Sequence, residues 1–238
     1  TDTGGAEVML EKLSRALSEL SNLSRSGRAA GEREGLQEVL SLLPVDTVGF
    51  RMRDAGIPVY SPGMNGGLPG PGSLLRLVRW LRRRRPAVLQ TWMYHADLLG
   101  GIAGRYLAGL PVIWNLRQSN LDPEVNTAST MRSARICAKL SGRVPDAIVC
   151  GSEAARRSHT AFGYEAGRMA VIPNGFDLER FRPDREVGLD ARRELGIPED
   201  APVVGLMARF DPQKDHRTFI EAARILSGRS DEAGGGQP

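Results

Sequence analysis

Short apolar runs alternate with segments of helical spacing along most of this chain, and this alternation restricts its fold more than any other feature. The apolar runs cover residues 39–43, 57–60, 88–92, 112–114, 147–150, 169–172 and 203–207. Helical spacing follows at residues 7–20, 73–85, 96–107, 131–140, 153–162 and 218–226. Short apolar runs bounded by turn residues are typical of buried parallel strands. We therefore expect an α/β protein built on a parallel, doubly wound, Rossmann-like sheet.

The composition changes near Pro173, which indicates a domain boundary. Residues 1–172 are expected to form one Rossmann-like domain. Residues 173–202 are rich in proline and charge and are expected to form a connector with one short helix at 190–195. Residues 203–226 then begin a second Rossmann-like domain with one strand and one helix, and residues 227–238 are expected to be a disordered tail.

The net charge of +4 comes from one arginine-rich segment. Six arginines lie in this segment with no acidic residue among them: Arg76, Arg79, Arg82, Arg83, Arg84 and Arg85. A general polyanion-binding protein would spread its basic residues more widely, so we do not expect nucleic acid as a partner.

Two cysteines in 238 residues give neither a disulfide framework nor a Cys-x-x-Cys spacing. No segment approaches the roughly 20 apolar residues that a membrane-spanning helix needs. Both features favour a soluble protein of the cytoplasm.

Several common catalytic patterns are absent from the sequence. It has no Gly-x-Gly-x-x-Gly, no P-loop, no His-Glu-x-x-His and no Gly-x-Ser-x-Gly. No Asp-x-Asp pair occurs, and the three histidines show no metal-ligand spacing. None of these patterns therefore indicates a metal or cofactor site.

What remains is a set of glycine and basic turns beside the expected strands. The Gly4-Gly5 pair opens a helix, whose free N–H groups suit an anion, although such a pair also forms ordinary tight turns. Arg209 and Lys214 follow a strand and could hold the two ends of a diphosphate, or else pair with the aspartates of their own loop. His95 lies where a strand ends and a helix begins, a position that faces ligands in open α/β sheets but also caps helices.

The order of these pieces resembles glycosyltransferase family 4, whose members have the two-domain GT-B fold. Six segments carry the resemblance: TGGAE at 3–7, QTWMYHADLLG at 90–100, VIWNLRQS at 112–119, SEAA at 152–155, VIPNGFD at 171–177 and RFDPQK at 209–214. Each segment alone is a weak signal, and six in the family's order are a strong one.

The resemblance implies a metal-free, retaining transfer of a sugar from a nucleotide-sugar donor to the hydroxyl of a sugar or lipid-linked acceptor, in polysaccharide, glycolipid or cell-envelope assembly. It implies that Gly4, Gly5, Arg209 and Lys214 bind the donor diphosphate. The family often has a histidine after the strand at 112–115, where this chain has Arg117 and Gln118 instead. Catalytic roles are therefore expected for His95 and Arg117, and Gln118, Asn174 and Gly175 are expected to line the same cleft.

Two departures from the family suggest a chain truncated at both ends. The family's first strand, before the Gly-Gly turn, is missing, and so is the Glu-x7-Glu segment that grips the donor's sugar. We expect this chain alone to transfer no sugar. Two other interpretations stay open: a non-catalytic remnant or acceptor-binding domain, and a nucleotide-sugar 2-epimerase, which shares the GT-B fold.

The helix expected at residues 73–85, between Ser73 and Arg85, has an apolar side and a strongly cationic side. The apolar side consists of Leu74, Leu77, Val78 and Leu81. Such a helix could hold the protein peripherally at the inner face of the membrane, or could be an ordinary surface helix whose arginines complement its dipole.

Overall fold

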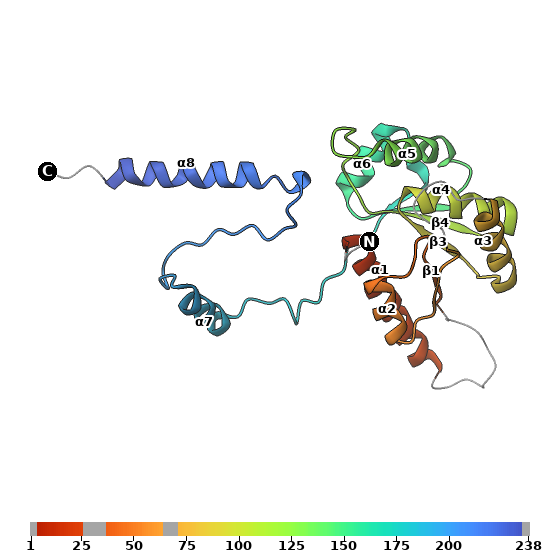
Figure 1. Ribbon diagram of the computed structural model, residues 1–238, viewed down its shortest axis with the longest axis horizontal. Coiled ribbons are helices and arrows are strands. Elements are labelled where there is room, and N and C mark those ends of the chain that lie inside the picture. Colours follow the sequence, from red (N-terminus) through yellow and green to blue (C-terminus); the bar gives the residue numbers. More distant parts are fainter. Residues whose placement is uncertain (1–3, 26–36, 64–70, 235–238) are drawn as a thin grey trace. The chain divides into compact units, whose positions relative to one another are not determined.

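The computed structural model describes residues 4–25, 37–63 and 71–234, and it divides into two units, Thr1–Gly175 and Phe176–Pro238. The first unit has a mixed α/β architecture with every strand pairing parallel (Figure 1), so the expected fold class is confirmed. Its strands are β1 (Val39–Leu40), β2 (Val59–Tyr60), β3 (Leu89–Trp92), β4 (Val112–Leu116), β5 (Ala147–Cys150) and β6 (Met169–Val171). Its α-helices are α1 (Gly5–Arg25), α2 (Thr47–Asp54), α3 (Pro71–Arg84), α4 (Tyr94–Ile102), α5 (Ala128–Leu140) and α6 (Glu153–Phe162).

The main sheet has the strand order β3-β4-β5-β6. Each crossover steps in the same direction along this sheet, and right-handed crossovers then place their helices on the same face. In Figure 1, α5 and α6 accordingly lie together above the strands, while α1 and α2 lie below them. The carboxyl ends of all four strands are therefore at one edge, which is where open α/β sheets bind ligands.

The single sheet expected for this unit is not observed, because the described strands form two sheets. β1 and β2 pair only with each other, with Val39 opposite Val59. The strand expected over residues 39–43 ends at Leu40. Leu40 and Leu42 instead pack against a cluster built from α3, which supplies Leu77, Val78 and Leu81. Helix α2 was not expected, and its Val48 and Met52 complete a third small core under β2.

The largest core lies between the main sheet and α4, α5 and α6. Trp114 and Ile148 are fully buried in it. Two glycines allow close packing here, since a Cβ at Gly101 would lie 2.6 Å from the Trp114 indole nitrogen and one at Gly104 would lie 2.6 Å from Leu89 Cδ2. The expected helix at 96–107 begins earlier, at Tyr94, and ends in a π-helical turn, Ala103–Ala108.

One histidine belongs to this core and not to a site. His159 Nδ1 donates to the carbonyl of Ala155 at 2.8 Å, and Nε2 accepts from the Tyr94 hydroxyl at 2.8 Å. Burial lowers the pKa of His159, so the ring is neutral. Cys137 and Cys150 are buried free thiols.

The second unit contains α7 (Arg185–Leu195), a short 3-10 turn (Pro212–Lys214) and α8 (His216–Gly234). The strand expected over residues 203–207 is not formed, since these residues pair with no other strand in the described chain. Strands are stable only as part of a sheet, and one apolar run cannot make a ladder by itself. The tail expected from residue 227 is also wrong in part, because α8 continues to Gly234. The helix expected at 190–195 begins earlier, at Arg185, where Asp184 caps it through the N–H of Val187.

A buried carboxyl group joins β3 to α4. Asp97 is fully buried, and its Oδ1 accepts a hydrogen bond from the Thr91 hydroxyl at 2.5 Å. Its Oδ2 has no hydrogen-bond partner in the described part of the protein. Burial raises the pKa of Asp97 well above its usual value, although hydrogen bonds from Thr91 and from the backbone of Asn115 oppose this. Burial therefore disfavours the ionised form of Asp97 in the folded protein, relative to the unfolded chain.

We predict that Asp97→Asn removes a pH-dependent loss of stability. A raised folded-state pKa means that stability falls as pH rises from the unfolded pKa to the folded pKa, by about 1.4 kcal/mol per pH unit. Asparagine cannot titrate, so the stability of the variant relative to the wild type should increase as pH rises. Urea unfolding of both proteins at pH 5, 6.5 and 8 measures this increase, and parallel pH profiles would contradict the prediction.

Candidate functional site

Four side chains meet at the carboxyl edge of the main sheet: Trp92, Asn115, Arg117 and Asn174. We call them the Arg117 cluster. The register of β3 and β4 sets Trp92 opposite Asn115. Arg117 directly follows β4, and Asn174 follows β6. The structure thus brings together Arg117 and Asn174, two of the residues expected to line a cleft, although they are far apart in sequence.

The guanidinium of Arg117 is held on three sides. Its Cζ lies 5.0 Å from the centre of the Trp92 ring, in cation–π geometry. Its Nη1 donates to Asn115 Oδ1 at 3.1 Å, and its Nη2 donates to Asn174 Oδ1. Asn115 is buried, so it provides a fixed acceptor for the arginine. Sequence reasoning assigned no role to Trp92 or Asn115, although both lie in segments that carry the family resemblance and at or beside the ends of two expected strands.

All of these partners are uncharged, and no acidic side chain in the described chain forms an ion pair with Arg117. Partial burial lowers the pKa of Arg117, but a guanidinium remains charged in proteins. Arg117 therefore cannot act as a general acid or base. The cluster can instead supply fixed positive charge and hydrogen-bond donors to an anion.

His95 lies near this edge but makes a different contact. It is exposed in the first turn of α4, and its Nε2 lies 3.2 Å from the Ser129 hydroxyl at the start of α5. No hydrogen bond in the described residues links His95 to the Arg117 cluster. Its catalytic role stays a prediction.

Gln118 and Gly175 flank the cluster. The Gln118 amide nitrogen donates to the Asn120 carbonyl and to Asn126 Oδ1, both at 2.5 Å, so this side chain fixes the loop that follows β4. Gly175 is not among the described glycines with positive φ, so its backbone conformation does not itself require glycine. Whether either residue contacts a substrate is still a prediction.

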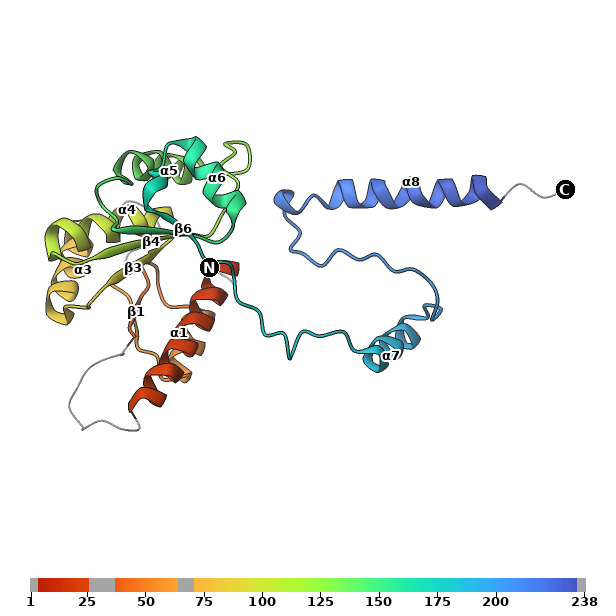
Figure 2. The same cartoon turned by 180° about the vertical axis from the view of Figure 1, so that it is seen from behind.

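Gly4 and Gly5 form a helix start, as expected. Helix α1 begins at Gly5, and the Gly4 carbonyl accepts the first helical hydrogen bond, from Val8 at 3.1 Å. Both views place this helix start at the side of the unit where the chain leaves β6 (Figures 1 and 2). A Cβ at Gly4 would lie only 2.3 Å from the Glu7 carboxylate. Glu7 therefore occupies the helix terminus that an anion would otherwise approach.

Arg209 and Lys214 lie in the second unit, on the loop before α8. Arg209 Nη2 is 3.8 Å from Asp211 Oδ2, and the Arg209 carbonyl accepts from His216 Nε2 at 2.7 Å. Asp215 caps α8 through the N–H of Thr218 at 3.2 Å. Lys214 is exposed, and its ammonium has no ion-pair partner among the residues with described side chains. That Arg209 and Lys214 share one cleft with the first unit stays a prediction.

No three His, Cys, Asp or Glu side chains gather into a possible metal site within the described ranges. Those ranges also contain no helix with the length and apolar character needed to cross a membrane.

Comparison with known proteins decides the family. The model of glycosyltransferase family 4 matches residues 3–180. The chain belongs to this family. The alignment includes the helix start at Gly4 and the whole Arg117 cluster.

Individual relatives agree with this assignment. A D-inositol 3-phosphate glycosyltransferase of Corynebacterium urealyticum is 33% identical over 138 residues, which cover 57% of this chain and 28% of the relative. An Escherichia coli enzyme, UDP-Gal:alpha-D-GlcNAc-diphosphoundecaprenol alpha-1,3-galactosyltransferase, is 25% identical over 155 residues, covering 65% of this chain and 40% of the enzyme.

Among solved structures, Anabaena HepE in complex with UDP and glucose has a TM-score of 0.69 at 21% identity, over 92% of this chain and 54% of HepE. A UDP-N-acetylglucosamine 2-epimerase of Rickettsia bellii is more distant, with a TM-score of 0.50 at 14% identity, over 82% of this chain and 49% of the epimerase. At these identities the likeness concerns the fold alone. The chain spans about half the length of HepE and less than half the length of the two curated relatives.

One strained residue directs β3 into α4 in this family 4 domain. Met93 has φ 74°, a region that favours glycine, and it precedes the turn that carries His95. Its N–H donates to the Asn115 carbonyl at 3.4 Å. Such a backbone conformation costs a residue with a side chain about 1–3 kcal/mol.

We predict that Met93→Gly is more stable than Met93→Ala by roughly 1 kcal/mol, since glycine relieves the strain. Both variants lose the same side-chain contacts, so the comparison isolates the backbone. At an ordinary position glycine is the less stable choice. Urea unfolding of the two variants measures their stability. If Met93→Ala is as stable as Met93→Gly, or more stable, the turn is not strained.

Proposed function

We propose that this protein transfers a sugar, with retention, from a nucleotide-sugar donor to a hydroxyl of a sugar or lipid-linked acceptor, in polysaccharide, glycolipid or cell-envelope assembly. The observation that carries the proposal is the family 4 match over residues 3–180. Two relatives support the substrate class: HepE binds UDP and UDP-glucose, and the E. coli relative acts on a diphosphoundecaprenol-linked sugar.

The chemistry requires that negative charge on the leaving diphosphate be stabilised. Fixed cations and helix N-termini can do this in place of a metal ion, and we propose that they do so here. Lys214 and Arg209 are the cations assigned to the diphosphate, together with the backbone N–H groups at Gly4 and Gly5, from which the Glu7 carboxylate would have to turn away. The 3.8 Å separation of Arg209 from Asp211 leaves that pair loose, so Arg209 can turn to a ligand.

The test is an assay of nucleotide release and sugar transfer with UDP-glucose and UDP-galactose, with and without EDTA. Transfer to an acceptor that persists in EDTA supports the proposal. Conversion of UDP-N-acetylglucosamine to its 2-epimer, with no acceptor present, would support a 2-epimerase instead. Binding of an acceptor sugar with no turnover of any donor would support a non-catalytic binding domain.

We predict that Lys214→Ala weakens binding of UDP by about tenfold or more, the usual effect of losing one charge-assisted hydrogen bond. Lys139→Ala is the matched control, because Lys139 is an exposed lysine on α5 in the other unit. Isothermal titration calorimetry with UDP measures both. If the Lys214→Ala and Lys139→Ala variants bind UDP equally well, Lys214 is not part of the donor site.

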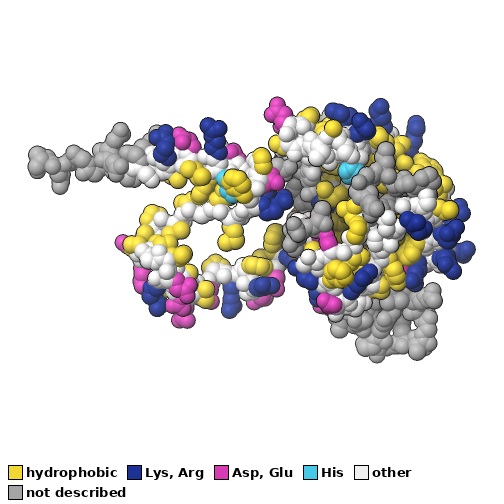
Figure 3. Space-filling model, in the orientation of Figure 1, with side chains coloured by type: hydrophobic (Ala, Val, Ile, Leu, Met, Phe, Trp, Pro, Cys, Tyr) yellow, Lys and Arg dark blue, Asp and Glu magenta, His cyan; other side chains and the backbone are white. Residues whose placement is uncertain are grey.

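We also propose that the arginines of α3 hold the protein at the inner, cytoplasmic face of the membrane. The apolar side of α3 packs into the protein, with Leu77, Val78 and Leu81 each buried. The outward side carries the arginines and one exposed leucine, Leu75, so contact with a membrane would be mainly electrostatic. Figure 3 shows Lys and Arg side chains gathered along the edge of the first unit where α3 lies.

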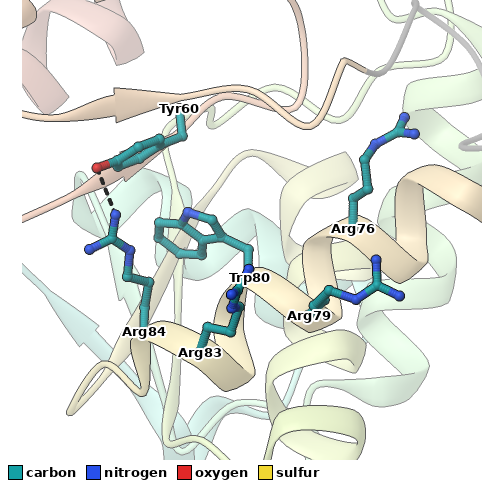
Figure 4. A pocket seen from close by; sticks show the side chains of 6 residues that line it. All are labelled: Tyr60, Arg76, Arg79, Trp80, Arg83 and Arg84. Carbon is teal, nitrogen blue, oxygen red and sulfur yellow. Dashed lines mark hydrogen bonds between the residues drawn. The ribbon is translucent and has the colours of Figure 1, made fainter.

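The arginines of α3 also surround a pocket of about 460 Å³ (Figure 4). Arg84 is committed to other groups, since it contacts Glu38 at 3.1 Å and the Tyr60 hydroxyl at 2.9 Å. Arg79 and Arg83 have no ion pair or hydrogen bond within the described chain. These two are the arginines best placed to meet an anionic headgroup, each contributing about 1 kcal/mol.

We predict that the double variant Arg79→Gln/Arg83→Gln binds anionic vesicles more weakly than the wild type. The control is Arg132→Gln/Arg135→Gln, which removes two exposed arginines from α5. Vesicles of phosphatidylglycerol and phosphatidylcholine are sedimented with each protein in 50 and 300 mM salt. Binding that is equal in all three proteins, or that is insensitive to salt, would contradict an electrostatic contact through α3.

A further inference from the structure

Arg117 is a partly buried cation whose contacts are all neutral. Its guanidinium lies on the Trp92 ring and donates to the amide oxygens of Asn115 and Asn174. Arg51, another half-buried arginine of the first unit, instead meets an acidic side chain, Glu11, at 2.5 Å. Removing a cation from water without an opposite charge is unfavourable, so this arrangement calls for an anion from outside the chain.

The guanidinium still has donors to offer such an anion. Arginine carries five N–H groups, and two of the nitrogens each use one hydrogen on an asparagine. The stack on Trp92 and the two amide contacts fix the plane of the group before any ligand arrives. A fixed guanidinium fork is well matched to the oxygens of phosphate or carboxylate.

Access to the guanidinium depends on a glycine. Gly151 follows β5, and a Cβ there would lie 3.6 Å from Arg117 Cζ. Any longer side chain at this position would extend over the charged group. Glycine leaves this side of Arg117 uncovered, at the edge of the sheet where ligands bind.

We propose that Arg117 binds an oxyanion, a phosphate or carboxylate, on the acceptor substrate and so selects acceptors that carry this charge. The proposal rests on the glycosyl transfer proposed above. It assigns the anion to the acceptor because Arg117 belongs to the first unit, whereas the cations assigned to the donor diphosphate, Arg209 and Lys214, belong to the second.

The first experiment is a titration of the 238-residue chain with methyl phosphate at constant ionic strength. The indole N–H signals are followed by NMR, since Trp92 lies against Arg117 while Trp80 and the buried Trp114 serve as internal references. The Trp92 signal is expected to shift to saturation with methyl phosphate and not with glucose. Equal shifts of all three indoles, or none, would overturn the site.

Variants then identify the residue responsible. Arg117→Gln should weaken methyl phosphate binding at least about tenfold, while the Trp92 signal still reports on it. Arg143→Gln is the control, because Arg143 is exposed on the turn between α5 and β5. An Arg117→Gln variant that binds as the wild type does would overturn the proposal.

The effect of Arg117→Gln on UDP affinity distinguishes an acceptor site from a donor site. UDP affinity within twofold of the wild type in Arg117→Gln supports an acceptor site. A loss as large as that of Lys214→Ala would place the donor diphosphate at Arg117 and overturn the proposal. The methyl phosphate titration does not depend on sugar transfer, so it still decides whether Arg117 is an oxyanion site if the proposed function fails.

Discussion

The parallel ladder between β3 and β4 determines where the side chains of the candidate site lie. It pairs Trp92 with Asn115, and it continues through β5 to β6 with Asn115 opposite Val149 and Cys150 opposite Val171. A shift by one residue would turn every side chain to the other face of the sheet. Because the strands are parallel, this one register brings the residues after three strands to the same edge. Arg117, Gly151 and Asn174 meet for this reason.

Sequence patterns predict an element well when the signals for it are local. Helix α6 was expected at residues 153–162, and it has those bounds, with Ser152 capping its first turn and Gly163 ending it in a left-handed conformation. The residues at 203–207 have an equally apolar pattern but form no strand in the described chain. A helix satisfies its own backbone, whereas a strand depends on partners that its own sequence does not contain.

The same distinction applies to the candidate site. His95 and Arg117 follow apolar runs, and the structure places them, as expected, just after β3 and β4. Arg209 also follows an apolar run, but the strand expected before it is not formed. The contact between Arg117 and Asn174 depends on β5 and β6 adding to the sheet beside β4, and no spacing in the sequence predicts it. The Glu7 carboxylate beside Gly4 is also a matter of side-chain geometry. A Gly-Gly pair before a helix therefore indicates a possible anion site without showing whether the chain already fills it.

The partners of each cation separate those that can bind a ligand from those that stabilise the protein. An arginine paired with an acid must give up that pair before it can bind an external anion, as Arg84 would have to leave Glu38. Surface pairs of this kind contribute at most about 1 kcal/mol, so they can be broken, but breaking them subtracts from the affinity. Arg117 and Lys214 carry no such penalty, because Arg117 has only neutral partners and Lys214 has no acidic partner in the described residues. These two residues lie in different units, one with a fixed guanidinium and the other with an exposed ammonium. In the roles proposed above, Lys214 holds the donor diphosphate and Arg117 holds the anion of the acceptor.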